Sequence, residues 1–146
     1  MRTSIKSALE SGMPCSAECG GLMYLSKKLY VDGESYDMVG ALDIDIAMEQ
    51  QRQAHGYSHI VVQDDHPWLT SGSDFMCHEH HHSKAVRIGE DIRFAYKNTR
   101  GQGIINNKDG AIYKNTVAGY AHVNAIADPI WAPSFVSAAK RYKDRS

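Results

Sequence analysis

The sequence contains no long hydrophobic segment, no cluster of basic residues and few cysteines. No stretch approaches the ~18 consecutive apolar residues of a membrane span, and the start, MRTSIKSALESGMP, has no apolar core of a secretory signal. Lysine and arginine number 16 against 17 acids, giving a net charge of −1, so no basic face for nucleic acid is expected. Three cysteines cannot all pair within one chain. These absences predict a cytoplasmic protein that binds neither membranes nor nucleic acid.

The length of 146 residues suits one domain, and we expect residues 1–146 to form it. A helix is predicted over residues 3–12 from the spacing of its apolar side chains, and a hairpin turn at Asp32-Gly33. Alternating apolar and polar residues then predict a series of strands. The segments predicted as strands are MVGALDIDIAM, YSHIVVQ, SDFMCHEHHHSKAV, IRFAYKNT, GAIYKN and VAGYAHVNAI.

The last predicted element is a helix that starts close to Pro133, whose ring suits a first helical turn. Its predicted apolar stripe consists of Phe135, Val136, Ala139 and Tyr142. Together, the patterns predict an α/β fold with a strand-rich middle, two helices near the start and one at the end.

The segment CSAECGGLMYL predicts a sharp turn between a strand over residues 14–18 and a helix from Leu22. A cysteine in such a turn, here Cys19, is exposed and faces a helix N-terminus, and the next N–H groups can hold an oxyanion. Gly20 and Gly21 remove the Cβ atoms that would crowd the bend. The residues alone also permit Cys19 to be a small buried hydrophobe, as free cysteines often are.

A nucleophilic cysteine needs a base, and His122 in GYAHVNA is the best candidate. Its ring lies in an apolar, strand-like run, where a polar group needs a specific partner. The alternative is a core histidine hydrogen-bonded to the backbone.

The two motifs together resemble a known family. AECGGLMYL followed later by GYAHVNA is similar to the C-terminal glutamine amidotransferase domain of the cobyrinic acid a,c-diamide synthase family. MVGALDID, CHEHHHS and YKNTVAGYAHVNA match further family segments, so the resemblance covers nearly the whole chain. It implies a class I glutamine amidotransferase-like, flavodoxin-like sheet. Within the family, YKNTRGQGIINNKDGAIYKN and DPIWAPSFV look most like members linked to sirohaem and nickel-sirohydrochlorin amidation.

The resemblance also implies roles for individual residues. Cys19 would attack the side-chain amide of glutamine, form a glutamyl thioester and release ammonia, with His122 as acid and base. Gly20 would supply an oxyanion N–H, and Gly21 belongs to the same motif. Other triad amidotransferases orient the histidine with a glutamate two residues later. That position is Asn124 here, in keeping with a branch that dispenses with the glutamate, so the partner that orients His122 is left open.

The histidine-rich segment CHEHHHS has two interpretations. On a strand, its two faces carry His78, His80 and His82, and Cys77, Glu79 and His81. Imidazole and thiolate are preferred ligands of zinc and copper, so one alternative is a metal-binding domain centred on Cys77 to His82. The family resemblance instead matches His78, Glu79 and His81, which become candidates for shaping the glutamine site or its face toward a synthetase domain. No metal is expected on that interpretation.

Full-length members of the family begin with an ATP-binding synthetase domain, whereas this sequence has no G-x-x-x-x-G-K-[ST] motif. ATP and magnesium are therefore expected only in a separate synthetase domain or subunit, with no cofactor in this chain. The matching domain normally starts earlier, so we expect its N-terminal part to be missing. The sheet edge left open would favour pairing with a second chain or a second copy. The missing part normally supplies the second oxyanion donor, and its loss would cost ~3 kcal/mol of transition-state stabilisation, which predicts weak or absent glutaminase activity of the isolated chain.

The function expected from the resemblance is the glutaminase portion of an ATP-dependent a,c-diamide synthase. Its substrate would be a cobyrinate-like or sirohydrochlorin-like tetrapyrrole bound at the domain interface. The alternative from another class is a catalytically inactive binding or scaffold module of the same fold.

Overall fold

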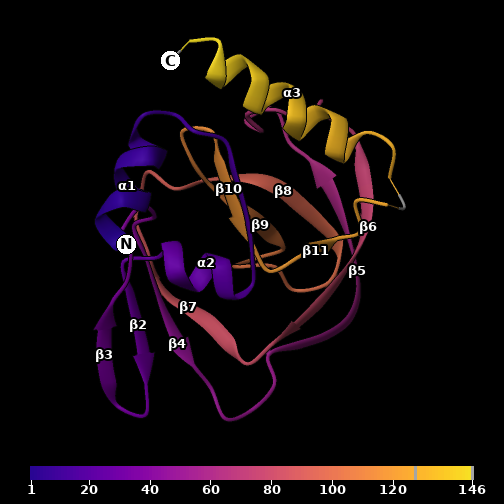
Figure 1. Cartoon of the computed structure of the whole chain (residues 1–146). Helices are drawn as coiled ribbons and strands as arrows, with labels where there is room; N and C mark the ends of the chain where they lie inside the picture. The colour runs from indigo at the N-terminus through magenta and orange to yellow at the C-terminus, as the bar shows by residue number, and fades with distance from the viewer. Residues whose placement is uncertain (127, 146) are drawn as a thin grey trace.

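The computed structural model describes residues 1–126 and 128–145, which form two β-sheets and three helices (Figure 1). Helices α1, Arg2–Glu10, and α2, Gly20–Leu25, lie near the start of the chain, and α3, Trp131–Lys143, lies near its end. This composition confirms the predicted α/β class and the predicted placement of the helices. None of the described helices is long and apolar enough to cross a membrane.

The smaller sheet has four strands in the order β3-β2-β4-β7. Its strands are β2, Lys28–Val31, β3, Glu34–Asp37, β4, Ile44–Met48, and β7, Ser83–Ile88. Strands β2 and β3 form the predicted hairpin, and the turn residues Asp32 and Gly33 have φ values of +50° and +83°. Two successive positive φ values match the twist of a two-residue hairpin, which is why an Asp-Gly pair suits this turn.

The larger sheet has seven strands in the order β1-β10-β9-β8-β5-β6-β11. Its strands are β1, Cys15–Glu18, β5, Ala54–Val62, β6, Asp74–His81, β8, Arg93–Arg100, β9, Lys108–Tyr113, β10, Thr116–Gly119, and β11, His122–Val123. Strand β1 pairs with β10 in parallel, and the other neighbours in this sheet are antiparallel. Among the described strands, β1 has a hydrogen-bonded neighbour on one side only.

The two edges of the larger sheet approach each other, because β10 ends at Gly119 and β11 begins at His122. Strand β10 is the neighbour of the edge strand β1, while β11 is the opposite edge. The sheet therefore curls back on itself, as Figure 1 shows. Cys19 follows one of these edges and His122 belongs to the other, so the curl brings together two residues far apart in sequence.

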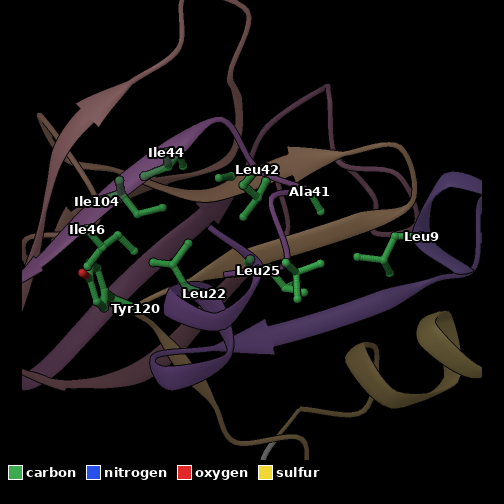
Figure 2. Packing of buried hydrophobic residues seen from close by; sticks show 12 residues of the cluster. Leu9, Leu22, Leu25, Ala41, Leu42, Ile44, Ile46, Ile104 and Tyr120 are labelled. Atoms are coloured by element: carbon green, nitrogen blue, oxygen red, sulfur yellow. The ribbon is translucent and has the colours of Figure 1, made fainter. Parts of the chain in front are cut away.

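The main hydrophobic core joins the two sheets to helices α1 and α2 (Figure 2). Leu22 from α2, Ile44 and Ile46 from β4, and Tyr120 are fully buried in it. Each large apolar side chain buried in this way contributes roughly 1.5–3 kcal/mol. The core holds α2 against the sheets directly behind the turn at Cys19.

A second core fixes helix α3, which crosses the side of the molecule away from the β2–β3 hairpin (Figure 1). Trp131 and Phe135 pack on Trp68, with 5.2 Å between the Trp68 and Phe135 ring centroids, and Ala138 is buried beside them. The predicted stripe was wrong at Val136, which is 51% exposed, and at Ala139, which is also exposed. The helix is rotated toward the aromatic side chains because Trp131 and Phe135 bury more area than valine and alanine.

Three segments predicted as single strands differ in the structure. SDFMCHEHHHSKAV divides at His82 into β6 of the larger sheet and β7 of the smaller one. VAGYAHVNAI divides at Tyr120-Ala121 into β10 and β11, and MVGALDIDIAM is a strand only from Ile44. The prediction of unbroken strands was wrong, because alternation reports the faces of a strand and not the sheet to which each half is hydrogen-bonded.

Candidate active site

Cys19 occupies the sharp turn that was predicted between a strand and a helix. Strand β1 ends at Glu18 and α2 begins at Gly20. The Cys19 backbone has φ +49° and ψ −100°, a conformation that few non-glycine residues adopt. Its N–H donates to the Gly119 carbonyl at 2.8 Å, which ties the strained turn to the end of β10. This geometry lifts the thiol out of the strand at the start of a helix, as in the elbows that present hydrolase nucleophiles.

Small residues make the turn possible. A Cβ atom on Gly21 would lie 3.0 Å from the Cβ of Ala17, closer than side chains normally approach. A Cβ on Gly20 would meet nothing within 4 Å. Gly21 is therefore needed for packing of the first helical turn on β1, whereas the open side of Gly20 leaves room for a ligand to approach the backbone.

The Cys19 thiol is half-buried and donates a long hydrogen bond, 3.8 Å, to the carbonyl oxygen of His80. Burial raises the pKa of the thiol, and the negative charge of Glu18 raises it further, while the N–H of Gly20 acts in the opposite direction. The resting side chain is therefore the protonated thiol. A reaction at this sulfur needs a base to remove the proton.

His122 lies on β11, directly opposite His78 of β6. Its Nδ1 is 3.0 Å from the His78 carbonyl oxygen, and because a carbonyl can only accept, Nδ1 carries the hydrogen. This bond fixes the neutral ring as the tautomer whose Nε2 lone pair is free to take a proton. A backbone carbonyl thus orients His122, in the position that a carboxylate takes beside the histidine of a Ser-His-Asp triad.

The candidate nucleophile and base meet the same short stretch of β6. The Cys19 thiol contacts the carbonyl of His80, and the His122 ring contacts the carbonyl of His78, two residues away. Strands β1 and β10 run in parallel, with Glu18 beside Gly119. The residues that follow the two strands therefore leave the sheet at the same end. The structure therefore places Cys19 and Gly20 beside the part of β6 that contains His78 and contacts His122.

Exposed aromatic rings continue from His122 across β6 and β5. The ring centroid of His78 is 6.5 Å from that of His122 and 5.9 Å from that of His55, and the centroids of His55 and His80 are 5.2 Å apart. Partial desolvation, followed by the charges of Arg52 and the neighbouring histidines, lowers the pKa of His80. The catalytic candidates therefore open onto a face lined by imidazoles, of which His80 is neutral at neutral pH.

The structure places Glu79 and His81 on the other face of β6, in the interior. Glu79 is 1% exposed and accepts hydrogen bonds from the backbone N–H groups of Gln102 and Gly103 and from the side chain of Asn98. Burial acts to raise the pKa of Glu79, but His81 and the two loop N–H groups outweigh it, so the pKa is lowered. Glu79 is therefore a carboxylate that holds the 101–103 loop.

His81 is part of the same interior arrangement. Its Nδ1 donates to the Ser83 carbonyl at 2.8 Å, and its Nε2 lies 3.7 Å from Glu79. The ring stacks on Tyr120 with 3.6 Å between centroids. Of the three histidine-segment residues predicted for the site, only His78 lies on the face of His122, while Glu79 and His81 support the strand from behind.

Asp109 on β9 is a further structural residue, which the sequence patterns did not reveal. It is fully buried and accepts hydrogen bonds from the backbone N–H groups of Tyr120 and Ala121, at 3.0 and 2.9 Å. Burial raises its pKa to about 6, against the lowering effect of these N–H groups. The carboxyl group thus shapes the break between β10 and β11 that precedes His122. The only signal in the sequence was an acid directly before a predicted strand.

Among residues 1–126 and 128–145, no group of three or more histidine, cysteine or acidic side chains is arranged to hold a metal ion. Cys77 is buried on the face opposite His78 and His80, and burial raises the pKa of its thiol to about 12. The alternative of a metal site that combines Cys77 with the histidines therefore finds no support in the described part of the chain.

Comparison with known proteins identifies a family and relatives of this chain. The model of a family described as the CobB/CobQ-like glutamine amidotransferase domain matches residues 1–129. The chain is 43% identical over 130 residues to a cobyrinate a,c-diamide synthase of Magnetococcus marinus, covering 89% of this chain and 28% of that protein. It is 40% identical over 157 residues to one of Methanosarcina barkeri, covering 99% of this chain and 32% of that protein. The chain thus spans less than a third of the length of these curated relatives.

Solved structures show the same fold. A crystal structure of a glutamine amidotransferase aligns with a TM-score of 0.65 and 17% identity, covering 95% of this chain and 68% of that one. A glutamine amidotransferase from Thermotoga maritima aligns with a TM-score of 0.51 and 12% identity, covering 97% of this chain and 55% of that one. These alignments confirm the predicted amidotransferase-like fold.

Proposed function

The chain belongs to the CobB/CobQ-like glutamine amidotransferase domain family, a family of enzymes, and on that basis we propose that Cys19 and His122 release ammonia from glutamine. The observation that carries this proposal is the strained turn at Cys19, held beside the same stretch of β6 that orients His122. Strain of this kind, of order 1–3 kcal/mol, persists where the surrounding structure enforces it, and it is concentrated at reactive sites.

In the first half of the reaction, Nε2 of His122 takes the thiol proton of Cys19, and the sulfur attacks the carbon of the glutamine side-chain amide. The carbonyl electron pair moves onto oxygen, and the N–H of Gly20 donates to this oxyanion. The imidazolium of His122 then returns the proton to the amide nitrogen. The carbon–nitrogen bond breaks, ammonia leaves, and a glutamyl thioester stays on Cys19.

In the second half, water enters the position vacated by ammonia. His122 takes a proton from the water, and the resulting hydroxide attacks the thioester carbon. The carbon–sulfur bond breaks, the thiolate regains its proton from His122, and glutamate leaves. The sum of both halves is glutamine plus water giving glutamate plus ammonia, with Cys19 and His122 restored.

The ammonia would be used by a second catalytic unit. The relatives named above are cobyrinate a,c-diamide synthases more than three times as long as the matched region. By analogy, a synthetase domain or subunit would activate tetrapyrrole carboxylates with ATP and magnesium, and the ammonia would form the amides there. A cobyrinate-like substrate follows from the names of these relatives, and a sirohydrochlorin-like one from the finer likeness of the segments YKNTRGQGIINNKDGAIYKN and DPIWAPSFV.

Labelling with a diazo-ketone analogue of glutamine tests the glutaminase proposal. The analogue should form an adduct on Cys19, located by peptide mass mapping, in the wild-type chain and in a Cys15→Ser control. Cys15 is a suitable control because it is a half-buried thiol on β1, the strand that leads to Cys19, and burial alone raises its pKa. Cys19→Ser should abolish the adduct, and His122→Gln should slow its formation.

The same experiment distinguishes the inert module from the enzyme. Absence of a Cys19 adduct, even in the presence of a synthetase partner, would refute the glutaminase proposal and favour a binding role for the fold. An adduct that forms equally fast in His122→Gln would refute the role given to the histidine.

A further inference from the structure

The strand that carries His122 has few attachments of its own. Strand β11 consists of His122 and Val123 only and pairs with two residues of β6, His78 and Cys77. Among the strands that the structure describes, none pairs with its other edge. A two-residue strand with one partner has little intrinsic stability, so the position of His122 depends on whatever else holds this backbone.

Asp109 holds the N–H groups of Tyr120 and Ala121 just before this strand, and Glu18 holds the strand itself. Oε1 of Glu18 accepts a hydrogen bond from the N–H of Val123 at 3.0 Å, across 105 positions in sequence. Glu18 is the last residue of β1, pairs with Gly119 of β10 and directly precedes Cys19. The carboxylate therefore connects the backbone next to the nucleophile with the backbone next to the base.

From this bridge we propose that Glu18 is a positioning residue, which sets the distance between Cys19 and His122 through its hydrogen bond to Val123. The inference rests on the glutaminase proposal and extends it to a residue that touches neither substrate nor the reacting atoms. Catalysis between two positioned groups is sensitive to displacement, and a shift of ~1 Å can lower a rate ~10²-fold.

The charge of Glu18 acts against the reaction, which allows bond and charge to be separated. A negative charge beside Cys19 raises the pKa of the thiol, after the larger effect of burial. Glu18→Gln keeps the side-chain length and an oxygen acceptor for Val123 but removes the charge. Glu18→Asp keeps the charge but is one methylene too short for the 3.0 Å bond. The two variants therefore separate the effect of the hydrogen bond from the effect of the charge.

Two reagents report on different properties of Cys19. Iodoacetamide needs only the thiolate, whereas the diazo-ketone analogue of glutamine also needs an aligned proton donor. We expect Glu18→Asp to slow diazo-ketone labelling by about 10- to 100-fold without slowing iodoacetamide labelling. Glu18→Gln should stay within about threefold of wild type with the diazo-ketone, since a neutral hydrogen bond keeps roughly half the strength of a charged one. It should also react faster with iodoacetamide.

Two results would overturn the inference: wild-type diazo-ketone labelling in Glu18→Asp, or an equal loss in both variants. Hydrogen exchange at the Val123 amide gives a test that does not depend on glutaminase chemistry. Exchange there should be at least about tenfold faster in Glu18→Asp than in Glu18→Gln, while amides of the β5–β6 pair stay unchanged. Equal exchange in the two variants would contradict the bridge. Failure of the wild-type chain to label, even in the presence of a synthetase partner, would instead count against the glutaminase proposal.

Discussion

Gly101→Ala tests the interior support of the site. Gly101 has φ +103°, outside the conformations that alanine adopts easily. A Cβ atom there would lie 2.5 Å from Oε1 of Glu79 and 2.6 Å from the Cβ of Ser58, both of which belong to packed strands. The substitution would therefore push the loop away from the carboxylate that anchors it.

The expected cost follows from two contributions. The unfavourable backbone conformation costs roughly 1–2 kcal/mol for a residue with a Cβ. Overpacking against Glu79 and Ser58 adds roughly 1–3 kcal/mol. Together they predict a loss of about 3 kcal/mol in the free energy of unfolding. In a domain of this size each kcal/mol lowers Tm by ~2–4 °C, so Tm should fall by about 10 °C.

Thermal unfolding followed by circular dichroism measures this loss. Gly20→Ala is the matched control, because a Cβ there meets nothing within 4 Å, and we expect its Tm to stay within ~2 °C of wild type. If Gly101→Ala also unfolds within ~2 °C of wild type, the loop is not held as tightly by Glu79 as its hydrogen bonds indicate.

Three further predictions concern charge and packing. Iodoacetamide labelling of Cys19 should rise with pH to a midpoint above 9.0, because burial and Glu18 raise the thiol pKa, and a midpoint below 9.0 would contradict that environment. The pKa of Glu79 is lowered from 4.5, so its contribution to stability is present above pH 4.5 and is lost as the pH falls through the folded-state pKa. In urea titrations, the free energy of unfolding of Glu79→Gln should therefore decrease less on acidification than that of wild type. Phe135→Ala should lower the free energy of unfolding by about 3 kcal/mol, because it removes the ring packed on Trp68. Val136→Ala, at an exposed position, should lower it by less than about 0.5 kcal/mol. Equal losses in denaturant titrations would mean that α3 presents a different face to the core.

The parts of the site that the sequence predicted are local. Cys19 was placed on a turn because a strand pattern, two glycines and a helix pattern follow one another within a few residues, and the backbone angles at Cys19 agree. The Asp32-Gly33 hairpin was predicted for the same reason. Short-range signals of this kind depend on steric preferences that each residue carries with it.

The parts that were missed depend on partners far along the chain. The break between β10 and β11 needs the carboxyl group of Asp109, and the division at His82 follows from the pairing of its two flanking strands in different sheets. Alternating polarity correctly placed His78 and Glu79 on opposite faces of β6, but it could not tell which face meets His122. The hydrogen bond from Val123 to Glu18 was equally invisible, because the two residues are 105 positions apart in sequence.

The orientation of His122 by the carbonyl of His78 has a genetic consequence. Every amino acid brings the same carbonyl to position 78, so scanning mutagenesis for a third catalytic side chain would leave this contact in place. The position of the backbone orients the His122 ring. Insertion or deletion of a residue in β6 would therefore disturb the ring, whereas exchange of one side chain would leave this hydrogen bond in place.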